Sequence, residues 1–598
     1  ASFQILPAVE ASDSETISFP LPIAPQDEKN IFDDEIALSS LFGELDSFVQ
    51  NAISYLVRIS HSAEQDPDFP GRFTYQADTR INLDKSLQIN YWKHHNQPDY
   101  NLLRHNGAIY ALSQAYHRNE EQNKKSPKKP RTHVTQTAIL KTMEKAVGYL
   151  RDNALLPVPN HKDDWIAAWE RDDPDDPHST PDTAKLGGAG LALIALGELE
   201  GIKPQSVSME KELRKLGAFI ESLQDKDTGS FTCKYKWGSG PSDKWVSLYY
   251  PGEAALGMVR LAELELQIEK EEEAKLRKMV TSTELEFEHQ HLKRHFTPTK
   301  QKFSERWIKV AKNSLLYLER LRRDQELDEI EPDHWALLAT ARLLPILDQQ
   351  RRDKADGSHG RKQADLDYWL IYNHGVKVAN SIVADHTTEG LAKHKGCFTY
   401  DDRTCPTSTR IEGLLAAMTF IEESEIFFGT EGDSTEPLIN RIERDVGSAI
   451  RFLLRAQFKT DYNNMKGAIP GQVTTEKLDL PEYGEDEDFD FAEVRVDYVQ
   501  HSMSAVMAYE AFLLDKMEKR HNQKAFHERV HEHVHKAVKH VKHKFDTATS
   551  SSVFVNYCIL GAVCLLFSFA VCLAYLPWSW ISFLGRRSRR RRRVKRKD

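Results

Sequence analysis

Cysteine is scarce in this chain, with six residues among 598. One apolar run near the C-terminus contains three of them, Cys558, Cys564 and Cys572. No Cys or His set has the spacing of a zinc site, and no phosphate-binding loop or dinucleotide fingerprint is present. The sequence therefore implies no metal and no cofactor. Cys397 and Cys405 could close a short disulfide in an oxidising compartment, or remain two free thiols.

The chain also lacks an N-x-Ser/Thr glycosylation sequon. This absence argues against a eukaryotic secreted protein and favours a bacterial periplasmic one. The opening ASFQILPAVEASD has neither the basic nor the apolar region of a signal peptide, so Ala1 is expected to be a processed terminus.

An excess of basic residues is confined to the C-terminal tail. The whole chain carries a net charge of −10. Its final segment, GRRSRRRRRVKRKD, holds ten positive charges and one aspartate, so the rest of the chain carries −19. An acidic body without a basic patch excludes nucleic acid as its partner. The 40% hydrophobic and 28% charged residues are typical of a globular protein.

One uncharged apolar run stands out, at residues 553–576. Its length matches the roughly 20 apolar residues that span a bilayer. The basic tail behind it is expected to stay cytoplasmic and to contact anionic lipid. The sequence therefore predicts a single-pass protein of a bacterial inner membrane with a periplasmic body and a cytoplasmic C-terminus. A tail-anchored cytosolic protein is the competing topology.

Six segments rich in Ala, Gly and Leu predict helices that are apolar on more than one side, as buried helices are. They are Tyr100–Ala115, Thr183–Leu199, Tyr249–Leu264, Asp333–Leu344, Thr409–Ile421 and Tyr498–Leu514. More charged helices fall between them, for example at 305–321 and 439–454. Such a long repeat predicts an all-α fold, an (α/α)6 toroid with short β segments in its loops. Two separate helical domains are the alternative.

The motif Gly-x-Phe-Thr recurs after amphipathic helices, at Gly71, Gly229 and Gly396. Glycine supplies a turn, while Phe and Thr favour extended backbone. The acidic stretch at 163–178 is predicted to be a solvated loop. The domain boundaries that follow are an extended arm at 1–36, the toroid at 37–520, a His-rich helical stalk at 521–550, a transmembrane helix at 551–580 and a polybasic tail at 581–598.

Each of the six buried helices has polar or aromatic residues near its N-terminal end, and in a toroid these ends meet at a central cleft. The predicted catalytic residues are Tyr250, Glu253, Asp333, His334 and His501. The predicted substrate-binding residues are Arg104, His105, Tyr249, Trp335, Arg410, Glu412, Asp497, Tyr498 and Gln500. Carboxylates, imidazoles, arginines and aromatic faces together suit acid–base chemistry on sugar rings.

Simpler interpretations exist for single members of this set. Glu253 and Asp333 lie where helices begin, and an acidic residue there is often a cap. His105 and His501 could be hydrogen-bonded core histidines, and Glu412 could pair with an arginine. The functional interpretation depends on the pattern recurring at all six helix ends.

This layout resembles the six-hairpin toroid superfamily of carbohydrate-active proteins, which includes glycoside hydrolases, polysaccharide lyases, N-acylglucosamine 2-epimerases and D-glucuronyl C5-epimerases. The resemblance covers residues 37–520 and points to no single family. It implies a hydrolase, epimerase or lyase that acts on an envelope glycan. The alternative is a non-catalytic scaffold that binds a glycan or a peptide.

Overall fold

The structure is a computed structural model that describes most of the chain between residues 35 and 547. The described residues are 35–64, 66–79, 83, 100–125, 135–174, 176, 178–242, 245–282, 302–354, 358–384, 396–399, 402–428, 436–473 and 493–547. Residues 1–43 and 44–598 form two separate units. The first contains only the start of helix α1 among its described residues, and all contacts below lie within the second.

Six helices of the described residues form a closed ring in which each packs against the next and the last packs against the first. These inner helices are α4 (Leu102–Lys125), α6 (Leu186–Ile202), α8 (Tyr250–Ser282), α11 (His334–Arg352), α13 (Thr404–Phe428) and α16 (Val496–Thr547). In α6 every residue from Leu186 to Leu199 is buried, as expected for a helix that is apolar on all sides. The six helices predicted from sequence are confirmed.

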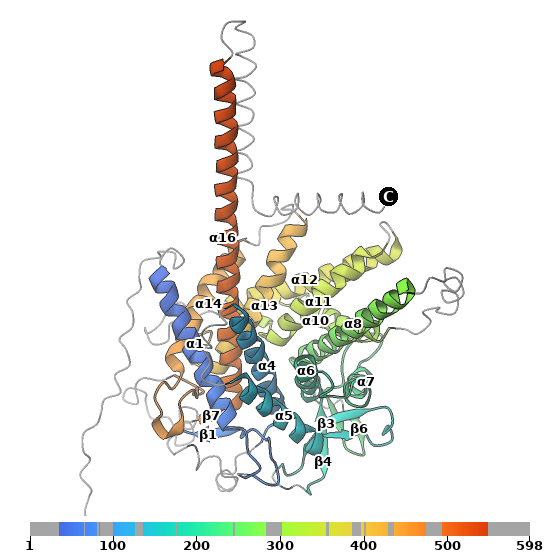
Figure 1. Cartoon of the computed structure of the whole chain (residues 1–598). Helices are drawn as coiled ribbons and strands as arrows, with labels where there is room; N and C mark the ends of the chain where they lie inside the picture. The colour runs from blue at the N-terminus through green and yellow to red at the C-terminus, as the bar shows by residue number, and fades with distance from the viewer. Residues whose placement is uncertain are drawn as a thin grey trace, which may run out of the picture. The chain divides into compact units, whose positions relative to one another are not determined.

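A second set of helices alternates with the inner ones along the chain and packs outside them (Figure 1). These outer helices are α1 (Glu35–Arg58), α5 (Gln136–Asn153), α7 (Arg214–Ser222), α10 (Phe303–Arg322), α12 (His359–Ala384) and α14 (Glu436–Ala456). Short helical segments lie at Met209–Leu213, Leu327–Glu329 and Tyr462–Asn464. Six outer–inner pairs in a closed ring make the described fold an (α/α)6 toroid.

A five-stranded antiparallel sheet, in the order β2-β3-β4-β5-β6, lies beside α6 and α7 in the described part of the chain (Figure 1). Its strands are β2 (Leu155–Pro157), β3 (Ile166–Arg171), β4 (Pro181–Lys185), β5 (Lys234–Lys236) and β6 (Gly240–Ser242). A second antiparallel pair joins β1 (Gln76–Asp78) to β7 (Glu493–Arg495), which leads directly into α16. This pair therefore links the first and last hairpins of the ring.

Glycine turns join neighbouring outer helices. Gly71, Gly229 and Gly396 all have a left-handed backbone, with φ of 92°, 72° and 97°. A Cβ atom on Gly71 would lie 2.2 Å from the carbonyl oxygen of Lys145 in α5, and the other two glycines press on α10 and α14 in the same way. Gly467 packs similarly on Asn51 of α1, although no Phe-Thr follows it. Only glycine tolerates both this backbone and this contact.

The membrane anchor is a prediction that the structure does not support. No helix in the described residues is long and apolar enough to cross a bilayer. The segments predicted as span and tail, 551–580 and 581–598, lie outside the described residues, as does most of the arm at 1–36. The single-pass fold class and the inner-membrane location are corrected accordingly: the described chain is a mostly helical toroid without a spanning helix. The anchor had been predicted only from the uncharged apolar run at residues 553–576.

Three local predictions also change. The stretch at 163–178 is not simply a solvated loop, because Ile166–Arg171 forms the partly buried strand β3. Thr183 lies in strand β4 rather than in a helix, and α6 begins three residues later at Leu186. The predicted stalk is no separate element, since α16 runs without a break from Val496 to Thr547. Cys397 and Cys405 are both free thiols.

Candidate active site

Side chains from five inner helices meet at the N-terminal end of the ring. We name this set the acid–base cluster: Arg104 of α4, Tyr250 and Glu253 of α8, His334 of α11, Glu412 of α13, and Asp497 and His501 of α16. The guanidinium of Arg104 connects its members, because it contacts Asp497 at 3.2 Å. Its positive charge also lowers the pKa of Glu253 and of His334, so both lie within its electrostatic reach.

Glu253 is the most deeply perturbed acid of the cluster. It lies in the first turn of α8, is 3% exposed, and its Oε2 atom has no hydrogen-bond partner among the described residues. Burial raises its pKa from 4.5 to about 8, against the opposing charge of Arg104. The carboxyl group is therefore mainly protonated at neutral pH. Gly187 of α6 makes room for it, since a Cβ there would lie 1.9 Å from Oε2.

Two histidines of the cluster, from different helices, face each other. The ring centroids of His334 and His501 are 5.4 Å apart, with the planes nearly perpendicular. Nε2 of His334 is buried without a partner in the described chain. Burial lowers the pKa of His334 well below 6.5, and the charges of His501 and Arg104 lower it further. His334 is therefore neutral and can accept or donate a proton.

Glu412 orients the second histidine. Nδ1–H of His501 donates to Oε1 of Glu412 at 2.8 Å, and both side chains are buried. The amide nitrogen of Gln500 points to Nε2 of the same ring at 3.4 Å. With the proton on Nδ1, Nε2 accepts from the Gln500 amide and is the atom through which the ring can act as a base. Burial raises the pKa of Glu412, while His501 lowers it.

Asp333 has a different role from its predicted catalytic one in this structure. It caps α11 by accepting from the backbone N–H of Ala336 at 3.0 Å, and it pairs with Arg322 at 2.9 Å. Burial raises its pKa, and Arg322 opposes that effect. Its negative charge still raises the pKa of Glu253. Asp333 thus lies next to the cluster with both oxygens occupied.

His105 lies apart from the cluster, against the outer layer. Its Nε2 donates to the carbonyl of Ala146 at 3.1 Å, and its Nδ1 accepts from the backbone of Phe73 at 3.4 Å. Burial lowers its pKa to about 3. Both ring nitrogens hold backbone groups of neighbouring turns, which is the arrangement of a core histidine.

The other predicted residues surround the cluster. Trp335 is buried with its ring 5.8 Å from that of His501. Tyr249 is half-exposed and donates from its hydroxyl to Glu331 at 3.3 Å. Arg410 lies close enough to lower the pKa of Tyr249. Tyr498 stacks under the guanidinium of Arg495, whose carbon is 5.6 Å from the ring centroid.

Two residues near the acid–base cluster, Cys405 and Trp245, were not among the site residues predicted from the sequence. The thiol of Cys405 lies 3.9 Å from Asp497, and burial raises its pKa, so it stays protonated. Trp245 packs on the ring of Tyr250 with centroids 5.2 Å apart. Only the position of Trp245, five residues before the helix start, could have suggested it. In the described residues no group of three or more His, Cys, Asp or Glu could hold a metal ion.

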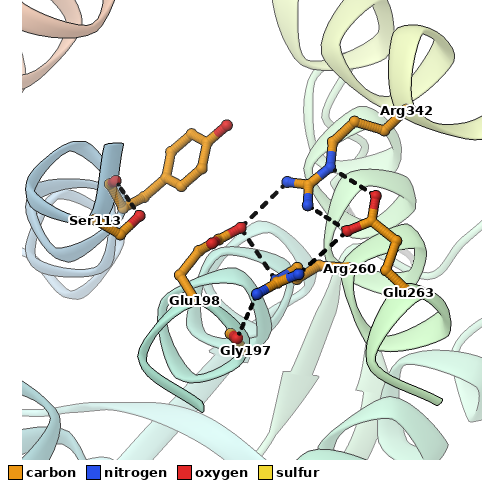
Figure 2. A network of polar contacts seen from close by, with 7 residues as sticks. Ser113, Gly197, Glu198, Arg260, Glu263 and Arg342 are labelled. Atoms are coloured by element: carbon orange, nitrogen blue, oxygen red, sulfur yellow. Dashed lines mark hydrogen bonds and ion pairs between the residues drawn. The ribbon is translucent and has the colours of Figure 1, made fainter. Parts of the chain in front are cut away.

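Deeper in the ring, a charge network joins α6, α8 and α11 (Figure 2). Arg260 contacts Glu198 at 3.1 Å and Glu263 at 3.3 Å. Arg342 contacts Glu198 at 3.2 Å and also pairs with Glu263. Two arginines and two glutamates therefore neutralise one another, two to three helical turns away from Glu253 and His334.

No family model matches this chain. No curated protein matches it either.

Several solved structures are similar in fold. A cellobiose 2-epimerase from Spirochaeta thermophila DSM 6192 is 12% identical with a TM-score of 0.44, over 81% of this chain and 100% of that one. A sugar epimerase from a ruminal bacterium is 11% identical with a TM-score of 0.44, over 79% and 98%. A glycosyl hydrolase family 88 protein from Bacteroides vulgatus is 11% identical with a TM-score of 0.33, over 67% and 92%. Carbohydrate-active proteins are thus among the structures that this chain resembles, as predicted from its sequence. The chemistry of the site is argued from its own residues.

Proposed function

We propose that this protein is an acid–base enzyme that moves protons on a sugar substrate at the acid–base cluster. One observation carries the proposal: Glu253 is buried, mainly protonated and has an Oε2 atom without a partner in the described residues, and it shares the electrostatic reach of Arg104 with His334, whose ring faces that of His501 at 5.4 Å. Buried polar atoms normally find partners, and a titratable group left without one beside other titratable groups is a candidate for chemistry.

The roles of the residues follow from their protonation. Glu253 can donate a proton at neutral pH, because burial keeps it protonated up to about pH 8. His501 can accept one at Nε2, because Glu412 holds the ring proton on Nδ1. His334 supplies a second neutral imidazole within reach of the first. Acid and base therefore come from different helices and can act on opposite sides of a bound substrate.

Arg104 supplies positive charge where negative charge would develop. Asp497 holds its Nε, and no other polar partner of this side chain exists in the described residues. The outer guanidinium amines are free to hold a substrate oxygen and to stabilise an anionic intermediate. The ring of Tyr250 offers an apolar face beside these polar groups. A sugar, which combines an apolar ring face with many hydroxyls, matches this mixture.

Among hydrolysis, epimerisation and β-elimination, the latter two fit the cluster better. Hydrolysis of a glycoside commonly uses a second carboxylate that faces the acid. Here the neighbouring carboxylates Asp333 and Asp497 are each held by an arginine. Proton removal from carbon needs a base next to a charge-stabilising cation, and His501 and Arg104 are suited to these two roles.

Proton exchange at carbon tests the proposal directly. The protein is incubated in D2O with a panel of neutral sugars and uronic acids, and incorporation of deuterium is followed by NMR. We expect wild-type protein to exchange a C–H proton of at least one sugar. Glu253→Gln should abolish the reaction, while Glu271→Gln, an exposed carboxylate on the same helix, should leave it unchanged.

Helical circular dichroism must be the same for all three proteins. Exchange that persists in Glu253→Gln would remove Glu253 from the mechanism. Binding of sugars without exchange, cleavage or elimination product by wild-type protein would overturn the enzymatic proposal in favour of a non-catalytic scaffold.

A further inference from the structure

Exposed apolar side chains gather in the segment that leads into α8. We name this set the aromatic rim: Trp237, Trp245, Val246, Leu248 and Tyr249. Their exposed fractions lie between 38% and 65%, and Trp237 and Trp245 are the exposed tryptophans of the described chain. Large apolar residues scattered singly need no explanation, but five within 13 positions form a patch.

The aromatic rim is continuous with the acid–base cluster. The ring of Trp245 packs against that of Tyr250 with centroids 5.2 Å apart. Burial raises the pKa of Tyr250, and the charge of Glu253 raises it further, so the phenol lies within electrostatic reach of that carboxyl. A single aromatic contact therefore separates exposed Trp245 from buried Glu253.

The exposed rings are held in place although solvent reaches them. The ammonium of Lys234 lies 4.4 Å from the centroid of Trp245, a cation–π contact. Trp237 packs edge-on against the buried Trp169 at 4.8 Å, and its backbone N–H donates to Asp182 at 2.8 Å. Aromatic surfaces that are already ordered lose little entropy when a ligand stacks on them.

Polar groups of the sheet lie beside the rings. The register of β4 and β5 places Lys185 opposite Lys234 and Thr183 opposite Lys236. Lys185 pairs with Glu170 at 2.8 Å, and Lys236 pairs with Asp182 at 2.7 Å. Hydrogen-bonding groups thus lie beside Trp245 on this face of the sheet, whereas Trp237 packs with Trp169 on the face that carries Tyr235. A lipid or a purely apolar protein surface would leave these ion pairs buried without compensation.

We infer that the aromatic rim binds the next units of a sugar chain whose terminal unit enters the acid–base cluster. A sugar ring stacks on Trp245, and its hydroxyls bind the polar groups of β4 and β5 on the same face. This inference deepens the proposed function and rests on it for the position of the terminal unit. The substrate is then an oligosaccharide rather than a free monosaccharide.

Binding measured without turnover tests the rim independently of catalysis. The Glu253→Gln protein is titrated with glucose, mannose, N-acetylglucosamine and galacturonic acid and with the hexamers of their β- or α-1,4-linked chains, and tryptophan fluorescence and calorimetry report the dissociation constants. We expect one hexamer to bind at least tenfold more tightly than its monomer. Trp245→Ala should remove this gain.

Phe303→Ala is the matched control, since Phe303 is an aromatic side chain of similar exposure at the start of α10. It should leave the gain intact. Equal binding of monomers and hexamers, or a gain that survives Trp245→Ala together with Trp237→Ala, would overturn the inference.

The two proposals fail separately. A chain-length gain that depends on Trp245, without any proton exchange by wild-type protein, would leave the rim standing and remove the enzyme. Exchange on a monosaccharide without a gain from chain length would leave the enzyme standing and remove the rim.

Discussion

The inner ring has two buried polar regions, the acid–base cluster and the charge network, and they differ in how their charged groups are paired. In the network of Figure 2, Arg260 and Arg342 each contact both Glu198 and Glu263. In the acid–base cluster, Glu253 and His334 are as well buried, yet each keeps a polar atom without a partner in the described residues. Glu253 and His334 lie on α8 and α11. The four residues of the network lie on the same two helices and on α6, which packs against α8.

The difference separates a structural use of polar residues from a chemical one. Paired charges in the network lock three helices in register and leave no group to react. Unpaired atoms in the cluster cost stability, which the rest of the fold must offset. Burial alone therefore does not identify a site. A buried atom without a partner does not suffice either, since Nε of Arg260 is one, and the cluster is distinguished because several titratable groups of this kind meet there.

The largest expected effect comes from Glu253→Gln. We expect activity to fall by about 10³-fold, because a general acid is lost. In the wild type, the raised pKa makes a contribution to stability that is complete below pH 4.5 and is lost as the pH rises through about 8. Activity should decline over the same rise, since the acid becomes ionised.

Urea unfolding at pH 5 and pH 9 tests the expected effect on stability. Glu253→Gln should gain stability relative to the wild type at pH 9 but not at pH 5. A variant that is less stable at both values would mean that Glu253 is a structural residue like those of the network.

Arg260→Met should mainly lower stability, in contrast to Glu253→Gln, which mainly lowers activity. Removing one cation leaves Glu198 and Glu263 with Arg342 alone, so we expect a loss of about 3 kcal/mol in the free energy of unfolding. The double variant Arg260→Met with Glu198→Leu should regain most of it, because one carboxylate is removed as well. Urea unfolding monitored by circular dichroism provides the measurement. A loss below about 0.5 kcal/mol would show that the network does not hold the helices.

Glu412→Gln should have a smaller effect on the reaction. His501 keeps a hydrogen-bond partner but loses the negative charge that orients and polarises its ring, so we expect about a 10- to 100-fold loss of activity. The maximum of kcat/KM against pH should also move, which a merely structural residue would not cause. Glu443→Gln, a carboxylate paired with Lys516 on the outside, is the control. An unmoved pH profile would contradict the positioning role.

Lys236→Gln should change least. Its ion pair with Asp182 is largely exposed, at 45% and 40% of the side chains, and such pairs contribute about 1 kcal/mol or less. Thermal unfolding in low salt checks the value. A change as large as that of Arg260→Met would erase the distinction between exposed and buried pairs.

The helices of the ring could be predicted from the sequence more completely than the sheet beside them. The six inner helices could be found because segments such as 186–199 are apolar on all sides, a pattern that only a buried helix needs. The sheet was mostly missed, since β3 lies in an acidic stretch and β4 (Pro181–Lys185) pairs with β5 (Lys234–Lys236) across the whole of α6 and α7. Local sequence carries little information on such pairings.

The site was predicted in part. The cluster contains four of the predicted residues, Glu253, His334, His501 and Arg104. They could be predicted because polar residues recur near the starts of the buried helices. Asp333 and His105 also lie near helix starts, yet Asp333 contacts Arg322 and the backbone of its own helix, and His105 contacts backbone groups of Phe73 and Ala146. Sequence pattern selects the helix end, whereas the partner comes from the tertiary fold.

The β1–β7 pairing joins the beginning of the toroid to its end. Together with the Gly467 contact on Asn51, it brings together segments separated by some 400 residues, as the hydrogen bond from Gln457 to Phe48 also does. Every hairpin thereby gains two neighbours, so no end repeat is left that would require a polar cap. The same joint closes the longest loop of the chain. Its formation should be the slowest step of folding, and its rupture turns a ring into an open arc.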